Sequence, residues 1–198
     1  MNILKDSIFA GIILSIAGIA SIKLAAPFNG IIFSFGLFLI ISLQLSLFTG
    51  NILKAESGIN KNYIIECVKS YIGNFTGCFI FAYMFGLACN NELILEIAEY
   101  KASLMFLPAL IKGIFCNVLV CIAVFLARKV NKSLNKFICV TVPVTLFVLC
   151  GFEHSIANMT FFLIAKSNVF NLIPVTIGNV IGGLLVVFMT RKVKVNSI

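Results

Sequence analysis

The chain has 198 residues, of which 61% are hydrophobic and 11% are charged, and it carries a formal net charge of +8. Soluble domains carry roughly 25% charged residues, so this composition excludes an ordinary soluble domain and indicates an integral membrane protein. The lysines and arginines gather between long apolar stretches. We therefore attribute the positive charge to membrane topology and expect no nucleic-acid partner.

Six apolar stretches are long enough to cross a bilayer, which takes about 20 residues. They cover residues 8–26, 28–53, 62–88, 104–127, 137–165 and 168–190. A cleaved signal peptide is an alternative for the first, but Asp6 near the start, the length of the run and the spans that follow favour a transmembrane helix. Because the connections are short, we expect a single all-α transmembrane domain over residues 1–198.

Basic residues in the connections predict the orientation of these spans. One side collects Lys5, Lys54, Lys61, Lys69, Arg128, Lys129, Lys132, Lys136, Arg191, Lys192 and Lys194, and the other has Lys23, Lys101 and Lys166. Since cytoplasmic loops of membrane proteins are rich in Lys and Arg, we expect both termini in the cytoplasm. A composition rich in Lys, Ile and Asn favours the cytoplasmic membrane of a bacterium.

The second and fifth stretches are too long and too interrupted to be plain helices. The second contains Gln44 and Ser46, followed by Thr-Gly-Asn at 49–51. The fifth contains Pro143, followed by Gly-Phe-Glu-His-Ser at 151–155. Non-helical backbone at membrane depth is tolerated only where it is buried in protein or lines a cavity. Both interruptions therefore indicate a pathway through the protein.

An internal repeat relates the two halves of the chain. The third stretch contains YIGNFTGC (71–78) and the sixth contains TIGNVIGG (176–183), and each follows an interrupted stretch at a similar distance. Either motif alone is also typical of close helix packing by small residues. Each half has an odd number of spans, so the second half enters the membrane from the opposite side. The pairing therefore predicts inverted repeats over about 1–90 and 100–198. This pattern is typical of transporters, whose site lies near the midplane.

Four motifs resemble the formate/nitrite transporter family. They are LFTGN (47–51), GIFCNVLVCIAVFLA (113–127), GFEHSIANM (151–159) and NLIPVTIGNVIGG (171–183). The resemblance implies an aquaporin-like fold in a homopentamer, with one pore in each subunit for small monovalent anions of weak acids such as formate, nitrite and hydrosulfide. The FTGN sequence is more similar to the nitrite and hydrosulfide branches than to the formate branch.

The resemblance also assigns pore residues. The central histidine falls on His154, its neighbouring acid on Glu153, the broken-loop threonine on Thr49, the vestibule lysine on Lys101, and pore asparagines on Asn117 and Asn179. The hydrophobic constrictions fall on Phe33, Leu37, Leu47, Phe48, Val120 and Phe147.

Each assignment has a structural alternative. His154 and Glu153 can serve only to tie a broken loop together, and Thr49 can be a helix N-cap. Lys101 can form a solvated ion pair with one of the glutamates at 92–99. The asparagines, Asn74 included, are expected to bond broken backbone rather than substrate. Lys112, inside the fourth stretch, has no counterpart in the motifs and stays open: it can snorkel, line a pentamer axis or add a second cation.

The chemistry of the residues agrees with anion transport. Stripping a small ion of water costs tens of kcal/mol in the ideal limit, whereas protonating a weak acid about three units above its pKa costs about 4 kcal/mol. Histidine titrates nearest to neutral pH. We therefore expect Lys101 to concentrate the anion and His154 to give it a proton or a strong hydrogen bond before it passes the ring of Phe and Leu side chains.

Other classes of protein fit less well. An aquaporin-like pore for neutral solutes is the alternative, although the sequence has no paired Asn-Pro-Ala loops. A single histidine cannot provide the two axial ligands of a membrane haem, and the seven cysteines form no CxxC pair, so we expect no cofactor, no metal site and no enzyme activity. The physiological anion, the direction of flow and the choice between channel and proton symport stay open.

Overall fold

The computed structural model describes residues 2–89 and 92–191, so Lys192 and Lys194, used above for the orientation, lie outside the described residues. Within the described ranges the chain is helical and forms no strand, which confirms the all-α expectation. The elements are α1 (Ile3–Ser21), α2 (Phe28–Ser42), α3 (Phe48–Asn51), the 3-10 helix η1 (Ile52–Ser57), α4 (Lys61–Ala88), α5 (Glu92–Ser103), α6 (Phe106–Lys129), α7 (Ser133–Leu149), α8 (Ser155–Ala165) and α9 (Leu172–Thr190). Of these, α1, α4, α6 and α9 are long and apolar enough to cross a membrane unaided.

Several predicted boundaries were wrong. Helix α1 begins at Ile3 rather than at residue 8, because the Asn2 side chain caps it by accepting from the Lys5 N–H at 3.3 Å. It ends at Ser21, before the turns at 22–27. Helix α9 begins at Leu172 rather than at residue 168.

One helix was not predicted. Helix α5 occupies the connection after α4, for which the sequence analysis named no element. Its buried side chains, Ile94 and Ala98, join the main hydrophobic core, so α5 covers the protein rather than extending from it.

The second and fifth apolar stretches are interrupted, and the two interruptions have the same geometry. Helix α2 ends at Ser42 and α3 starts at Phe48, while α7 ends at Leu149 and α8 starts at Ser155. Pro143, which we counted among the interruptions of the fifth stretch, lies inside α7 and is not part of the break.

Each break opens with a left-handed residue, Gln44 (φ 56°) in one and Gly151 (φ 61°) in the other. The next residue donates its N–H five residues back, Leu45 to the Ile40 carbonyl and Phe152 to the Phe147 carbonyl. This is the Schellman arrangement that closes a helix C-terminus.

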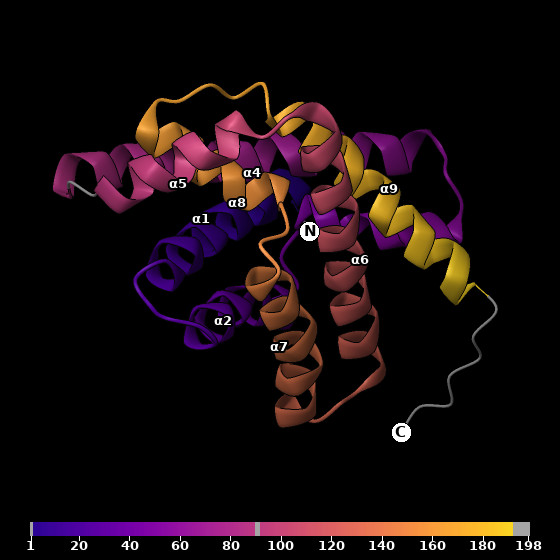
Figure 1. The fold of residues 1–198 in the computed structure, drawn as a ribbon. Coiled ribbons are helices and arrows are strands. Elements are labelled where there is room, and N and C mark those ends of the chain that lie inside the picture. Colours follow the sequence, from indigo (N-terminus) through magenta and orange to yellow (C-terminus); the bar gives the residue numbers. More distant parts are fainter. Residues whose placement is uncertain (1, 90–91, 192–198) are drawn as a thin grey trace.

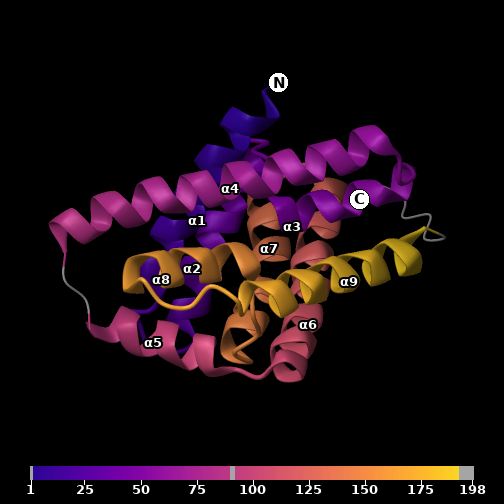
Figure 2. The ribbon, with the colours of Figure 1, turned by 90° about the horizontal axis from the view of Figure 1, so that it is seen from above.

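The long helices pack as two related groups. Helix α1 packs on α4 and α2, α6 packs on α9 and α7, and α2 and α7 pack on each other (Figure 1). Seen from above, α3 lies between α4 and α9, and α8 lies between α4 and α5 (Figure 2). The short helices that follow the breaks are therefore enclosed by the longer ones.

Glycines allow the closest of these contacts. A Cβ at Gly77 of α4 would meet the backbone of Ile8 in α1, and a Cβ at Gly182 of α9 would meet the backbone of Ile114 in α6. The glycines of the two repeat motifs thus serve helix packing, as small residues do in membranes. Their asparagines have a different part, described next.

Candidate functional site

Asn74 and Asn179 hold the two breaks by matching hydrogen bonds. Asn74 Oδ1 accepts from the Phe48 N–H at 2.9 Å, and its Nδ2 donates to the carbonyls of Ser46 at 3.0 Å and Ser7 at 2.8 Å. Phe48 is the first residue of α3, and Ser46 lies within the break. One fully buried amide therefore satisfies backbone groups on both sides of the first break.

Asn179 repeats this arrangement at the second break. Its Oδ1 accepts from the Ser155 N–H at 2.9 Å, and its Nδ2 donates to the carbonyls of Glu153 at 3.0 Å and Gly113 at 2.8 Å. Ser155 is the first residue of α8, as Phe48 is of α3. Asn117 also bonds backbone, since its Nδ2 donates to the carbonyls of Asn179 at 2.6 Å and Thr49 at 3.3 Å.

His154 and Thr49 bring the two breaks together. His154 Nε2 lies 2.9 Å from Thr49 Oγ1, although the residues are 105 positions apart in the chain. Both side chains are buried, with His154 3% and Thr49 0% exposed. The contact joins the start of α3 to the start of α8.

The hydrogen bonds of His154 specify its tautomer. His154 is the N-cap of α8, and its Nδ1 accepts from the Ala157 N–H at 3.2 Å. A neutral imidazole has one donor and one acceptor nitrogen. With Nδ1 accepting, the proton sits on Nε2 and points to the Thr49 oxygen, which leaves the Thr49 hydroxyl hydrogen free to donate elsewhere.

Lys101 pairs with Glu153 and not with the glutamates of its own helix. Its Nζ lies 2.8 Å from Glu153 Oε2, the same oxygen that accepts from Asn158 Nδ2 at 2.6 Å. The Glu153 side chain is 1% exposed and that of Lys101 is 16% exposed. Lys101 Nζ also lies 5.9 Å from the centre of the Phe161 ring. The lysine and the acid predicted for the pore thus form one buried pair between α5 and α8.

A cavity of about 140 Å³ lies beside this pair and His154, and we call it the outer cavity after the side that the basic residues of the connections predict for it. Its lining includes Lys101, His154, Asn158, Phe33 and Phe147. The Phe33 and Phe147 rings meet edge to face at 5.5 Å, and the Phe147 ring lies 6.2 Å from the imidazole. Two of the predicted constriction residues therefore border the histidine.

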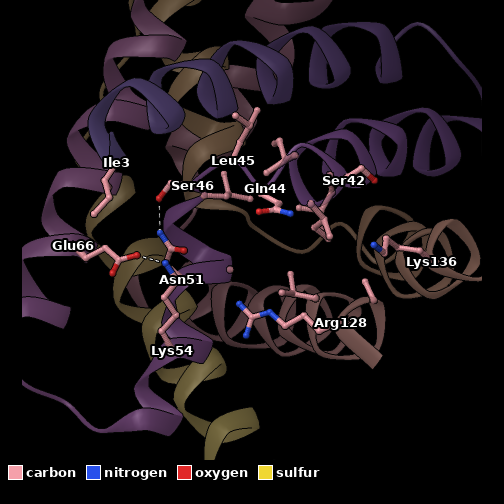
Figure 3. A pocket seen from close by; sticks show the side chains of 17 residues that line it. Ile3, Ser42, Gln44, Leu45, Ser46, Asn51, Lys54, Glu66, Arg128 and Lys136 are labelled. Carbon is pink, nitrogen blue, oxygen red and sulfur yellow. Dashed lines mark hydrogen bonds and ion pairs between the residues drawn. The ribbon is translucent and has the colours of Figure 1, made fainter. Parts of the chain in front are cut away.

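A second cavity of about 350 Å³ opens at the opposite ends of α1, α2, α6 and α7, and we call it the inner cavity (Figure 3). Leu37 and Leu47 line it, and both are buried. Val120 and Phe48 line neither cavity. Val120 lies in the core, and the Phe48 ring packs 4.9 Å from that of Tyr71, facing an apolar hollow against α4 and α9. The six predicted constriction residues are therefore not one ring.

The polar lining of the inner cavity was not predicted from the sequence. It includes Gln44, the ion pair of Lys54 with Glu66, and the side chains of Arg128 and Lys136. These residues come from four different elements and from the break after α2, and they share no local motif that would have identified them.

Lys112 lies on neither cavity. Its Nζ donates to the Tyr100 hydroxyl at 3.1 Å and lies 5.4 Å from the centre of that ring. Its main-chain carbonyl accepts from the Glu153 N–H at 3.3 Å. Lys112 thus braces α5 and the second break, away from both cavities. No cluster of three metal-ligating side chains occurs within residues 2–89 and 92–191.

Comparison with known proteins identifies the family. The profile of the family described as "Formate/nitrite transporter" matches residues 1–192. The chain belongs to this family. It is 31% identical over 238 residues to the formate channel FocA of Escherichia coli strain K12, an alignment that covers 93% of this chain and 83% of FocA.

Two further similar proteins extend the comparison. An uncharacterised transporter of Saccharomyces cerevisiae is 32% identical over 179 residues, which cover 79% of this chain but 28% of the yeast protein. A solved pentameric formate channel with formate bound superposes with a TM-score of 0.76 at 28% identity, covering 94% of this chain and 93% of that one. The resemblance predicted from the motifs is confirmed, and the chain is a membrane transport protein rather than an enzyme.

Proposed function

We propose that this protein is a channel for small monovalent anions of weak acids, with formate as the first candidate and nitrite and hydrosulfide as the others. The observation that carries the proposal is the Thr49–His154 contact at 2.9 Å, made between two helix breaks and bordered by the outer cavity. FocA is a formate channel, and the structural relative is a pentameric one with formate bound. By analogy, each subunit of a homopentamer would hold its own pathway.

The proposed topology has six crossings in inverted repeats. In it α2 with α3, and α7 with α8, each make one broken crossing. The matched bonds of Asn74 and Asn179 support this, as do the matched left-handed residues Gln44 and Gly151. Both termini would lie in the cytoplasm of a bacterial cell, because Arg128 and Lys136 lie at the cavity that the positive-inside rule assigns to that side.

The mechanism we infer delivers a hydrogen bond beside the outer cavity, which His154 lines. His154 donates from Nε2 to the buried Thr49 oxygen. The Thr49 hydroxyl lines neither cavity in this structure, and we infer that it donates to the transported acid as the acid passes between them. The neutral imidazole has no proton to give, since losing the one on Nε2 would leave an imidazolate. Of the two roles expected for His154, the hydrogen bond is therefore the one that the geometry supports.

The proton for neutral passage then comes from water in a cavity. It costs about 1.36 kcal/mol for each unit by which the pH exceeds the pKa of the transported acid. The neutral acid next meets the Phe33 and Phe147 rings, which offer no charge to an ion. Asn158 Oδ1, on the outer cavity and without a hydrogen-bond partner among the described residues, can accept the hydroxyl of a carboxylic acid.

Lys101 would contribute less than the sequence suggested. Because its ammonium contacts Glu153 at 2.8 Å, the outer cavity receives the field of a pair and not of a free cation. This neutrality favours the second candidate function, a pore for small neutral solutes.

Transport assays separate the two functions. Purified protein in liposomes is tested for uptake of formate, nitrite, hydrosulfide and glycerol at about pH 5.5 and about pH 7.5, where histidine and weak acids change protonation. We expect anion flux that rises at the lower pH, a large loss in His154→Ala and partial retention in His154→Asn, whose amide can still donate to Thr49. Glycerol flux without anion flux would replace the proposal with the neutral pore.

A further inference from the structure

The inner cavity holds two cations without acidic partners. The four charged side chains on its lining are Lys54, Glu66, Arg128 and Lys136. Lys54 pairs with Glu66. Within residues 2–89 and 92–191, which include every Asp and Glu of the chain, no carboxylate pairs with Arg128 or Lys136. The lining therefore has a formal net charge of +2, whereas the Lys101–Glu153 pair leaves the outer cavity neutral.

These cations face a polar side chain across the cavity. Arg128 is on the last turn of α6 and Lys136 on the first turn of α7, so the short α6–α7 connection places both at one end of the helix pair. Arg128, Lys136 and Gln44 all line this one cavity, and Figure 3 shows Gln44 on the side opposite Arg128. The backbone of Gln44 is left-handed, a conformation that favours glycine and that Gly151 occupies in the other break. An amide side chain at this position is thus held against the local backbone preference.

We propose that Arg128, Lys136 and Gln44 form an anion-binding site at the inner mouth, where a two-oxygen anion such as formate or nitrite is held before it enters the pathway. The inference rests on the proposed function and adds a substrate preference to it. A guanidinium offers paired donors whose spacing matches the two oxygens of a carboxylate. Hydrosulfide has a single acceptor atom, so the site holds it by charge alone.

The site makes the two mouths unequal. A cleft lined by one sign of charge raises the local concentration of counter-ions by about 10-fold to 10³-fold, and salt screens the effect. Formate should therefore half-saturate the inner mouth at a concentration about 10-fold lower than the outer mouth at low salt, and the difference should shrink at high salt.

The test measures the concentrations of formate and of hydrosulfide that half-saturate transport from each face of the protein. It uses vesicles with the protein in both orientations, at low and at high salt. The variants are Arg128→Gln, Arg128→Lys and Lys136→Gln, with Lys132→Gln as the matched control. Lys132 is an exposed cation of the same α6–α7 connection that does not line the cavity. We expect Arg128→Gln and Lys136→Gln to raise the inner value for formate about 10-fold without changing the outer value, and Lys132→Gln to change neither.

Arg128→Lys separates charge from geometry. It keeps the charge but loses the paired donors. It should therefore raise the half-saturating concentration of formate at the inner face and leave that of hydrosulfide at the wild-type value. Equal half-saturation from both faces in the wild type, or equal effects of Arg128→Gln and Lys132→Gln, would overturn the inference.

Binding without transport distinguishes this inference from the proposed function. In detergent, formate should raise the unfolding midpoint of the wild type in proportion to its binding, and Arg128→Gln should abolish the rise. If the wild type moves no anion but shows this dependence on Arg128, the proposed function fails and the site stands. If formate does not stabilise the wild type at all, the site is overturned.

Discussion

Removing either repeat asparagine should destabilise the fold by a large and similar amount. Asn179→Ala deletes three hydrogen bonds of 2.8 to 3.0 Å and leaves the Ser155 N–H and the carbonyls of Gly113 and Glu153 without their partner. Asn74→Ala deletes three bonds of 2.8 to 3.0 Å at the other break.

The magnitude follows from the number of bonds. An unsatisfied buried polar group costs about 1–3 kcal/mol in general. Hydrogen bonds between membrane helices average about 0.6 kcal/mol and reach about 1.7 kcal/mol. With three bonds lost, each variant should lower the free energy of unfolding by about 2–5 kcal/mol.

Reversible unfolding in mixed micelles, followed by circular dichroism, measures this free energy. Asn168→Ala is the control, because Asn168 is exposed and, among the residues that the structure describes, its side chain bonds only the nearby Phe170 N–H. It should stay within about 0.5 kcal/mol of the wild type. Losses below about 1 kcal/mol in both repeat variants would refute the reasoning, because the surrounding groups would then have found other partners. A large loss at only one asparagine would refute the equivalence of the two breaks.

Three further predictions concern the pathway and its frame. Thr49→Val removes the acceptor of the His154 Nε2–H, so anion flux in liposomes should fall about 10-fold or more, consistent with loss of a positioned donor. Thr49→Ser keeps the hydroxyl and should keep most of the flux. Equal flux in both variants would exclude a role of the hydroxyl in transport. Lys101→Gln leaves the Glu153 carboxylate buried without its cation and should cost about 3–5 kcal/mol of unfolding free energy. Most of that loss should return in the double variant with Glu153→Gln, and a double variant as unstable as the single one would contradict a paired charge. Gly182→Leu should force α9 away from the α6 backbone and reduce the yield of folded protein in detergent, and unchanged yield and stability would show that this contact can relax.

Local residue types carried much of the prediction. Gln44 and Ser46 in one stretch, and Gly151 to His154 in the other, lie in the breaks, because non-helical backbone at membrane depth needs polar and glycine residues that are held by the protein. Thr49, Gly50 and Asn51, which we also expected in the first interruption, instead form helix α3 with Phe48. Pro143 was misleading, since a proline can remain inside a helix that is closed several residues later by a left-handed residue.

Contacts between distant residues could not be predicted in the same way. The partner of Lys101 is Glu153, 52 residues away, and not a glutamate of its own helix. In the sequence Arg128 and Lys136 indicate only the orientation of the spans in the membrane. The fold shows that they share a cavity with Gln44. Helix α5 was missed because its three glutamates and the short run of apolar side chains resemble a solvated connection.

The matched breaks separate architecture from selectivity. Leu47 and His154 have almost the same backbone angles, as N-caps of α3 and α8. The same asparagine bonds hold both segments, yet one position carries an aliphatic group and the other an imidazole. A few side chains on a shared backbone thus give the two breaks their different chemistry. The transported solute can therefore change, in evolution or by mutagenesis, without a change of the backbone.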